Sequence, residues 1–518
     1  MAGRNYTTAS VPISSKALNG GLNSAGGALS LQDNESSDLQ NIDFDKFGSI
    51  MKRNGYTALN TTSLNAGADS NGLVWYEYES AGTTIRKAVN VCGNKIYKMD
   101  DLDGTWDNIT SASAITITTG NHCDFETWQR RLFATNGNDL PFNWDATNCS
   151  GITLSEVPAT MTKAKFVKQF NNYLFYGNIT LATGANSSRI YWSDFKNAKS
   201  WTAISFIDIA QNDGQEITGM KVLSDRLVVF KDRSIYNVYF TGDVDVPFVM
   251  PGGGKSNSTV GCIAPFSIQE VDNGLVFLSY DGFYYYDGMN SYKISDKVTD
   301  TLDGMSKTML TKVVSLVQKN KNRCLWGMTA SGSSEHNRVI VWDYSANIWS
   351  VYTGMSPSSM ATFFVSGTDE QPYWADYGGY TYRGDVGSTD YPLNVATAID
   401  AYYWTNWKTY DDLVDQKGVA HIAIYHQVAS TTLTFAYAYD FDSGAQYTQS
   451  IDLSTSSDKY GTGVYGTAKY ARSGGNVIRR DMPLGRGRVI RFKFANNIIG
   501  KTFQIDGFGT EAHLETNA

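Results

Sequence analysis

One pattern recurs through the middle of the chain, between about residues 70 and 390. A short apolar segment meets a turn that contains Asp, Asn or Gly, and a second segment rich in aromatic residues follows. The clearest copy is LVFLSYDGFYYYDG at 275–288, in which Asp281-Gly282 is expected to supply the positive φ angles of a two-residue hairpin turn. The weaker copies are NKIYKMDDLDGTW (94–106), RLFATNGNDLPFNW (131–144), NYLFYGN (172–178) leading to RIYWSD (189–194), RLVVFKDRSIYNVYF (226–240), NRVIVWDYSANIW (337–349) and PYWADYGGYTYRG (372–384).

The spacing of these copies favours one architecture. Their centres lie roughly 40 to 60 residues apart, close to the ~40–50 residues of one four-stranded propeller blade. The chain has 32 Tyr, 24 Phe, 12 Trp and 48 Gly but only 10 Pro, a composition that suits pleated sheets joined by tight turns. A pair of β-sandwiches would also show short strands and frequent turns. Because the period is regular, we predict an all-β protein in which residues 61–395 form a β-propeller of five to seven blades.

Helical periodicity is nearly absent. Only residues 300–318, DTLDGMSKTMLTKVVSLVQ, carry apolar side chains at three- and four-residue spacing, beginning with Leu302, Met305 and Met309. This segment is the one predicted helix.

The two ends of the 518-residue chain differ from its middle. Residues 1–60 are rich in Ser, Asn and Gly, and we predict an extended N-terminal arm that packs on other elements or on a neighbouring subunit. Residues 396–518 contain the alternating runs TTLTFAYAYDFD and RVIRFKF and the Gly/Tyr stretch YGTGVYGTAKY (460–470), which predict a C-terminal antiparallel β-sandwich. Arg488, Arg491 and Lys493 are interpreted as the solvated face of its final strand and not as a nucleic-acid patch.

Charge and cysteine content exclude several classes of protein. The formal net charge is −8, which argues against a protein that clamps DNA phosphates. The five cysteines are scattered and contain no C-x-x-C pair, so we interpret them as reduced core thiols made in a cytosol. They are Cys92, Cys123, Cys149, Cys262 and Cys324. The sequence has no apolar core of signal-peptide length near its start and no run of about 18 apolar residues, so no membrane-spanning segment is expected.

The run PGGGKS at 251–256 resembles a phosphate-binding loop at first sight. Such a loop needs a glycine five residues before its Gly-Lys pair and a helix after it, so that successive backbone N–H groups surround the phosphates. Here that position is Val249, Pro251 has no N–H to donate, and TVGCIAPFSI, typical of a strand, follows. We therefore expect a mobile loop between propeller strands and no nucleotide site.

Other candidate chemistry is weak. DDLDG at 100–104 partly resembles a calcium loop but lacks the distal Glu, so turn-forming Asp is the favoured role, with a structural cation left open. The five histidines (His122, His336, His421, His426 and His513) are scattered, and no sialidase repeat or nucleophile elbow occurs. The aromatic content also allows sugar binding, although sheet packing accounts for it more simply. We predict no enzyme, and no catalytic, cofactor-binding or metal-binding residues.

Several motifs occur together in the order typical of one family. In GGLNSAGGALSLQDNESSDLQNIDFDKFGSIMKRNGY (20–56), the matching residues are Gly21, Leu22, Asn23, Asn41, Asp43, Asp45, Lys52, Arg53, Gly55 and Tyr56. Further along stand RIYWSD, FIDIAQNDGQEITGM (206–220), LVVFKDRSIYNV, STVGCIAPFSI, LVFLSYDGFYYYDG with KISDKV, then YGTGVYG and GRGRVIRFKF. Over most of its length the chain resembles the tail nozzle or hub proteins, also called packaged-DNA stabilisation proteins, of short-tailed double-stranded-DNA bacteriophages.

The resemblance implies a structural virion protein of the phage tail, assembled in the host cytoplasm. It implies a β-propeller protein in a homohexameric ring below the portal and adaptor, in contact with tail fibres or spikes. Double-stranded DNA would pass through without sequence-specific binding and be retained until ejection. Across the turn at Gly48, Asp43 and Asp45 are expected to pair with Lys52 and Arg53 as exposed ion pairs of about 0–1 kcal/mol each. The alternative is a tail-associated propeller that binds a receptor or glycan, with or without hydrolase activity.

Overall fold

The computed structural model is dominated by β-strands. It describes residues 10–15, 18–45, 48–110, 115, 117–146, 151–364, 369–454, 477–481 and 485–515. The Gly/Tyr stretch 460–470 and Cys149 lie outside the described residues. No helix in the described part has the length and hydropathy needed to cross a bilayer.

Seven four-stranded sheets follow one another along the described chain. The first five are antiparallel: β8 (Ser70–Ser80), β9 (Thr83–Cys92), β10 (Lys95–Asp100) and β11 (Asp107–Asn108); β12 (Asp124–Trp128), β13 (Arg131–Thr135), β14 (Phe142–Trp144) and β15 (Thr153–Leu154); β16 (Met161–Phe170), β17 (Tyr173–Leu181), β18 (Gly184–Trp192) and β19 (Phe206–Asp208); β20 (Ile217–Leu223), β21 (Arg226–Lys231), β22 (Ile235–Phe240) and β23 (Phe248–Val249); β24 (Gln269–Val271), β25 (Gly274–Ser279), β26 (Gly282–Tyr286) and β27 (Ser291–Lys293). The last two are β28 (Val314–Gln318), β29 (Arg323–Met328), β30 (Arg338–Asp343) and β31 (Ile348–Tyr352); and β32 (Ser359–Phe364), β33 (Glu370–Ala375) and β34 (Thr381–Gly384) with β7 (Tyr56–Ala58).

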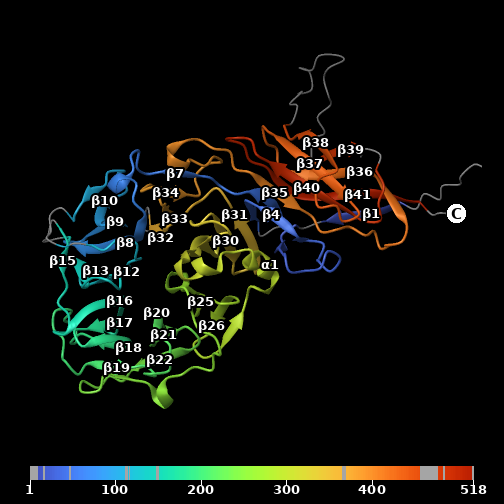
Figure 1. Ribbon diagram of the computed structural model, residues 1–518. Helices are drawn as coiled ribbons and strands as arrows, with labels where there is room; N and C mark the ends of the chain where they lie inside the picture. The colour runs from blue at the N-terminus through green and yellow to red at the C-terminus, as the bar shows by residue number, and fades with distance from the viewer. Residues whose placement is uncertain are drawn as a thin grey trace, which may run out of the picture. The chain divides into compact units, whose positions relative to one another are not determined.

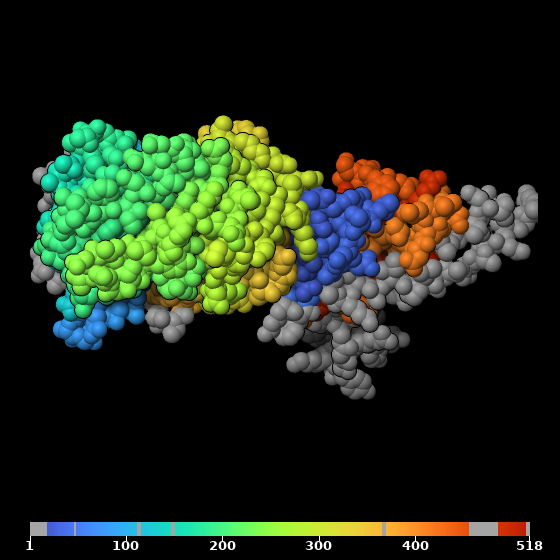
Figure 2. All heavy atoms as spheres, turned by 90° about the horizontal axis from the view of Figure 1, so that it is seen from below, coloured from blue at the N-terminus to red at the C-terminus, as the bar shows by residue number. Residues whose placement is uncertain are grey.

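The sheets are arranged as a β-propeller (Figure 1). The first strand of each sheet is the innermost one, and neighbouring first strands contact each other around the ring, as in β8 with β12 and β32 with β8. Aromatic side chains fill the space between adjacent sheets; Phe248, for example, packs with ring centroids 4.8 Å from Phe175 and 5.2 Å from Trp192. Figure 2 shows this part from below, with the green segments succeeding one another along its rim. The predicted all-β propeller is confirmed, at the upper end of the expected number of blades.

An early segment of the chain completes the last sheet. β7 is the outermost strand beside β34, and the Leu59 N–H donates to the Thr381 carbonyl at 2.8 Å. Next to it, the buried Asn60 side chain accepts from the Thr381 N–H at 2.8 Å and donates to the Gly379 carbonyl at 3.0 Å. The ring is thus closed by hydrogen bonds between residues more than 300 positions apart.

The chain divides into two compact units. The propeller unit comprises Thr57–Val339 and Met355–Gly384, and the sandwich unit comprises Met1–Tyr56, Ile340–Gly354 and Asp385–Ala518. The boundary at residue 339 falls within β30.

The sandwich unit contains two larger sheets. The six-stranded sheet has the order β39 (Val477–Asp481), β36 (Gln416–His426), β41 (Gln504–Glu515), β6 (Ile50–Lys52) and β5 (Ile42–Phe44), with β1 (Ser10–Ser15) also paired to β41. The five-stranded sheet has the order β38 (Tyr447–Asp452), β37 (Thr432–Tyr439), β40 (Ile490–Asn496), β35 (Ala401–Trp404) and β4 (Asp38–Gln40). The sheets pack face to face, since Phe508 of the first lies 5.5 Å from Phe492 and 5.7 Å from Phe494 of the second. A small parallel pair, β2 (Gly21–Leu22) and β3 (Glu35–Ser36), completes the unit.

The N-terminal segment forms the predicted hairpin but not the predicted ion pairs. β5 and β6 pair antiparallel, and the turn between them contains Gly48 with a φ of 107°. Arg53 instead pairs with Asp390, at 2.9 Å and 2.6 Å through both guanidinium ends, and both side chains are almost fully buried. Lys52 is buried and donates to Asn496 Oδ1 at 2.9 Å. The expectation of exposed pairs across the turn was wrong, because the strands bury this segment against distant parts of the chain.

Two local predictions were also wrong in detail. The helix expected at 300–318 is only α1 (Thr299–Asp303), followed by the 3-10 helix η5 (Lys307–Lys312) and strand β28. The β-branched Val313, Val314 and Val317 favour a strand over a helix there. In the hairpin at 275–288, Ser279 pairs with Gly282, so the turn residues are Tyr280 and Asp281. The remaining 3-10 helices are η1 (Leu64–Ala66), η2 (Pro251–Gly253), η3 (Pro265–Ser267), η4 (Asp296–Val298), η6 (Lys319–Lys321) and η7 (Pro392–Asn394).

Candidate functional site

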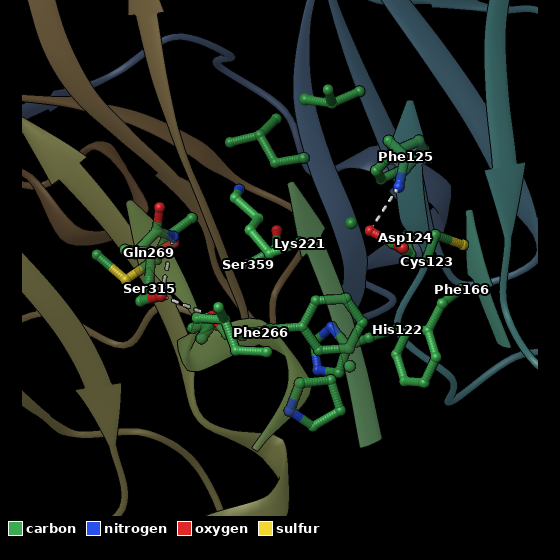
Figure 3. A pocket seen from close by; sticks show the side chains of 18 of the residues that line it. His122, Cys123, Asp124, Phe125, Phe166, Lys221, Phe266, Gln269, Ser315 and Ser359 are labelled. Carbon is green, nitrogen blue, oxygen red and sulfur yellow. Dashed lines mark hydrogen bonds between the residues drawn. The ribbon is translucent and has the colours of Figure 1, made fainter. Parts of the chain in front are cut away.

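The inner strands of the propeller unit enclose a cavity of about 250 Å³ (Figure 3). Each of the seven sheets supplies a lining residue from its first strand: Val74, Asp124, Lys168, Lys221, Gln269, Ser315 and Ser359. Propeller geometry explains this convergence, because the first strands of all sheets meet at the centre. The axial cavity is the one place where all seven sheets can act on a common ligand.

Glycines shape the wall of the axial cavity. A Cβ atom on Gly72 would lie 2.7 Å from the Phe125 ring, and one on Gly219 would lie 2.5 Å from Ile268 Cδ1. A side chain at either position would force these neighbouring side chains to shift, so glycine lets the adjacent sheets approach closely here.

One ion pair in the axial cavity is fully satisfied. Lys168 Nζ lies 2.6 Å from Asp124 Oδ1 and also donates to the Phe125 carbonyl at 3.3 Å. The other carboxylate oxygen of Asp124 accepts from the Val167 N–H at 3.0 Å. This pair links β12 to β16, and its two charges neutralise each other without a ligand.

A second pair of opposite charges is not in contact. Lys221 has neither a hydrogen bond nor an ion pair with any described residue, and Glu126 has no cation within 4.0 Å in the same part of the chain. Burial lowers the pKa of Lys221, and neighbouring Lys168 lowers it further, while Glu126, Asp124 and Glu270 oppose the change. Burial raises the pKa of Glu126 to about 7, with Lys168 and Lys221 offsetting part of the shift.

The polar groups on the opposite wall of the cavity form hydrogen bonds with one another or with nearby residues. Gln269 Nε2 donates to Ser315 Oγ at 3.0 Å, and that hydroxyl donates to the Phe266 carbonyl at 2.6 Å. Ser359 and Ser70 share a hydrogen bond of 2.6 Å. Figure 3 shows the Lys221 side chain extending toward the space between these groups and Asp124.

His122 closes one side of the cavity. Its ring centroid lies 5.2 Å from that of Phe266, and burial, with His336 and Lys312 nearby, lowers its pKa to about 4. The imidazole is therefore neutral at pH 7. Among the described residues no three His, Cys, Asp or Glu side chains lie close enough to hold a metal ion.

The glycine-rich loop does not form a phosphate cradle. η2 (Pro251–Gly253) is followed by backbone hydrogen bonds to β22, from the Asn237 N–H to the Gly254 carbonyl at 2.8 Å and from the Ser256 N–H to the Ile235 carbonyl at 2.9 Å. The loop thus continues along a strand edge, and no helix starts directly after Ser256. The expected strand at TVGCIAPFSI was wrong, because residues 259–268 contain the 3-10 helix η3 (Pro265–Ser267) and no strand.

The remaining sequence candidates have structural roles. At 100–104, Asp101 and Leu102 take the positive φ angles of a turn, and Asp100 pairs with Lys87 and Lys98. His336 is buried between Thr329 Oγ1 and the Lys312 carbonyl, at 2.7 Å and 3.0 Å. The other three histidines lie in the sandwich unit, on β36 and β41.

The four described cysteines are buried and form no disulfide, as predicted. They are Cys92, Cys123, Cys262 and Cys324. Burial raises the pKa of Cys92 and of Cys262 to about 12, so these thiols stay protonated and unreactive.

The basic residues of the last strands are not one solvated face. Arg491 is only 9% exposed and lies over the rings of Trp404 and Trp407, at 4.2 Å and 4.7 Å. Lys493 lies over Tyr402 at 4.2 Å, while Arg488 is exposed. The prediction failed for Arg491 because the aromatic residues of β35 and its following loop cover it.

One motif of the sequence resemblance proves to be scaffolding. Within FIDIAQNDGQEITGM, Asp213 accepts two hydrogen bonds, at 2.9 Å and 3.0 Å, from Lys231, which is completely buried. Lys231 also donates to the Ala210 carbonyl at 3.1 Å. The motif therefore fixes the loop before β20 to strand β21.

Sequence reasoning missed the charged residues of the axial cavity. The available signal was a pair of polar positions two residues apart on an inner strand, such as Asp124 and Glu126, or a lysine within an apolar first strand, such as Lys168 and Lys221. Each of these sequence patterns is common in strands and does not by itself predict a site. The residues come together only because the sheets form a ring.

Comparison with known proteins gives one clear result. Residues 45–323 match the model of a phage stabilisation family described as bacteriophage P22 Gp10, β-propeller. No curated protein matches the chain in sequence.

Similarities to solved structures are weaker. A chain of the S. cerevisiae Dbp5 structure bound to Nup159, Gle1, IP6 and ADP shares 11% identity and a TM-score of 0.38, over 64% of this chain and 95% of that one. The N-terminal domain of Nup159 shares 13% identity and a TM-score of 0.36, over 64% and 94%. PorZ, a surface component of the type-IX secretion system of Porphyromonas gingivalis, shares 11% identity and a TM-score of 0.39, over 70% and 44%.

Proposed function

This chain belongs to the phage stabilisation family of bacteriophage P22 Gp10, a β-propeller protein, and from that membership we propose that it is the nozzle or hub of a phage tail. In this proposal six copies form a ring below the portal and adaptor proteins. The ring continues the DNA channel, contacts the tail fibres or spikes, and helps to retain the packaged DNA until ejection. The family match, which covers 45–323, is the observation that carries the proposal.

The charge of the chain supports this role. With a net charge of −8, the protein has no general excess of cations to hold phosphates. A neutral or acidic channel wall repels the DNA backbone weakly and lets the polymer slide past. The protein would then act by shape and assembly, without catalysis.

Electron microscopy of the purified chain mixed with its portal–adaptor complex tests the proposal. We expect six-fold rings seated on the adaptor. The proposal would be overturned if single subunits do not bind the adaptor but bind host polysaccharide. That result would favour a receptor-binding propeller. A reconstruction of the ring that shows a continuously basic channel surface would contradict the proposal that DNA slides past a neutral or acidic wall.

The loop at 251–257 is the proposed gating element of the channel. Its exposed glycines Gly252 and Gly253 have positive φ angles and open space around them. Deleting both should release packaged DNA early from assembled virions, measured as nuclease-sensitive DNA. A matched deletion of Asp243 and Val244, in the exposed loop of the same sheet, is the control. Equal DNA retention in both variants would remove the loop from the mechanism.

A further inference from the structure

The axial cavity holds charges that its own side chains do not neutralise. Lys168 and Asp124 form a contact ion pair at 2.6 Å, whereas Lys221 on the next inner strand has no partner among the described residues. Glu126 on β12 is near enough to influence the charge of Lys221, but it does not line the cavity and makes no ion pair with a described residue. The cavity of about 250 Å³ is therefore lined by one ammonium, that of Lys221, that has no paired carboxylate among the described residues.

An unpaired ammonium in such a place is costly. Buried charges in proteins are normally paired or hydrogen-bonded, because desolvation disfavours the ionised form. The charged groups that face Lys221 are Lys168 on β16, Asp124 and Glu126 on β12, and Glu270 on β24. None of them contacts it, and the neutral groups opposite, Gln269 and Ser315, already bond to each other. The ammonium of Lys221, which lines the cavity, therefore has three N–H donors without an acceptor among the described residues.

We propose that the axial cavity of the propeller binds a small oxyanion, a carboxylate or sulfate-like group, with Lys221 Nζ as its anchoring cation. The site lies at the convergence of the seven inner strands and is independent of the proposed tail function. A ligand of this class would supply the counter-charge that Lys221 lacks. It would also add a contact between inner strands that already meet through packing, the Asp124–Lys168 pair and hydrogen bonds such as Gln269–Ser315 and Ser70–Ser359.

Glu126 gives the site a predicted pH dependence. Its pKa of about 7 means that it loses its negative charge as the pH falls from 8 to 6, which removes a repulsion on the bound anion. Asp124 stays paired with Lys168, and His122, with a pKa of about 4, stays neutral. Binding should therefore tighten toward pH 6.

The test is calorimetric titration of the full chain with sulfate and with acetate, at pH 6 and pH 8 and at constant ionic strength. Neither anion changes its charge over this range. We expect saturable binding that is about five-fold or more tighter at pH 6. Lys221→Met, which keeps the aliphatic stem, should abolish it, whereas the exposed Lys307→Met should leave it unchanged. Equal heats for wild type and Lys221→Met would overturn the proposal.

If Lys221→Met fails to fold, sulfate binding by a second variant, Glu126→Gln, tests the same site. Glu126→Gln removes the repelling carboxylate but keeps its shape, so it should bind sulfate at pH 8 about five-fold tighter than wild type. Its affinity should also differ little between pH 6 and pH 8. A Glu126→Gln protein that binds no better than wild type at pH 8 would contradict the assigned site.

Discussion

The two compact units of this protein use opposite kinds of chain connection. In the propeller unit each sheet consists mainly of consecutive strands, such as β16 to β19, joined by short turns. In the sandwich unit strands from residues 10–52 pair with strands from 401–515. The same all-β composition thus produces one unit held by local pairing and another held by contacts across nearly the whole chain. Local pairing forms early and tolerates single losses, whereas long-range pairing depends on a few junctions.

Breaking the Arg53–Asp390 junction should have the largest effect. Arg53→Ala leaves a buried carboxylate without its cation, and such losses destabilise by about 3–5 kcal/mol. The Thr353 carbonyl also loses the donor that Arg53 supplies, and Asn41 Oδ1 loses one of its two donors, the other being the Thr353 N–H. Urea denaturation with hydrogen exchange should place the loss in the sandwich unit. Protection lost mainly in the propeller unit, or a cost below about 1 kcal/mol, would contradict the long-range account.

Acid should weaken the propeller unit through His336. Burial lowers the pKa of this histidine to about 4, from an ordinary value of 6.5. The unfolded chain therefore binds the proton more readily, so stability is complete above pH 6.5 and falls as the pH decreases toward 4, by about 2–3 kcal/mol. His336→Gln should reduce the slope of this part of the urea-denaturation profile, and the slope that remains is expected from His122, whose pKa burial also lowers to about 4. Thr329→Val, which removes the hydroxyl bonded to His336, should lower the free energy of unfolding without changing its dependence on pH. If His336→Gln leaves the slope of stability against pH unchanged, His336 is not the source of the acid sensitivity.

The ring closure is the one long-range junction of the propeller unit. Asn60→Ala removes the acceptor of the Thr381 N–H and the donor to the Gly379 carbonyl, both buried. We expect a loss of about 1–3 kcal/mol. Hydrogen exchange should detect the faster opening at β34 before the other sheets. If the variant exchanges hydrogen equally fast in all seven sheets, the hydrogen bonds that close the ring do not control local opening at β34.

The smallest effect is expected at an exposed local pair. Lys307 and Asp303 lie 3.0 Å apart with more than half of each side chain exposed. Lys307→Ala should change the free energy of unfolding by no more than about 0.5 kcal/mol. The same urea experiment measures it and serves as the baseline for Arg53→Ala. A cost comparable to that of Arg53→Ala would erase the distinction between local and long-range pairing.

The sequence was informative where structure is local. Repeated hairpins such as LVFLSYDGFYYYDG predict sheets made of neighbouring strands, and the regular spacing predicts their radial arrangement. The local differences were a detail of the turn, at Tyr280 and Asp281, and the helix expected at 300–318, which is only one short α-helix followed by a 3-10 helix and a strand.

The same reasoning failed where partners are distant. Arg53 was assigned to acidic residues about ten positions away, but its partner stands at Asp390. Arg491 was assigned to solvent, although Trp404 and Trp407 cover it. The axial cavity was not predicted at all, because its residues come one by one from seven sheets. Periodicity defines which face of a strand is buried and does not define which other strand it meets.

Ring closure by β7 has a consequence for biosynthesis. On the ribosome, the segment around residue 58 emerges more than 300 residues before Thr381, the partner it needs. At roughly 5–20 residues per second, that interval lasts on the order of 15 to 65 s. During this time six sheets can assemble behind a nascent strand whose backbone donors remain unpaired. The order of translation thus makes the start of the chain the last piece to be placed, and a transient binder of extended peptides would find its substrate there.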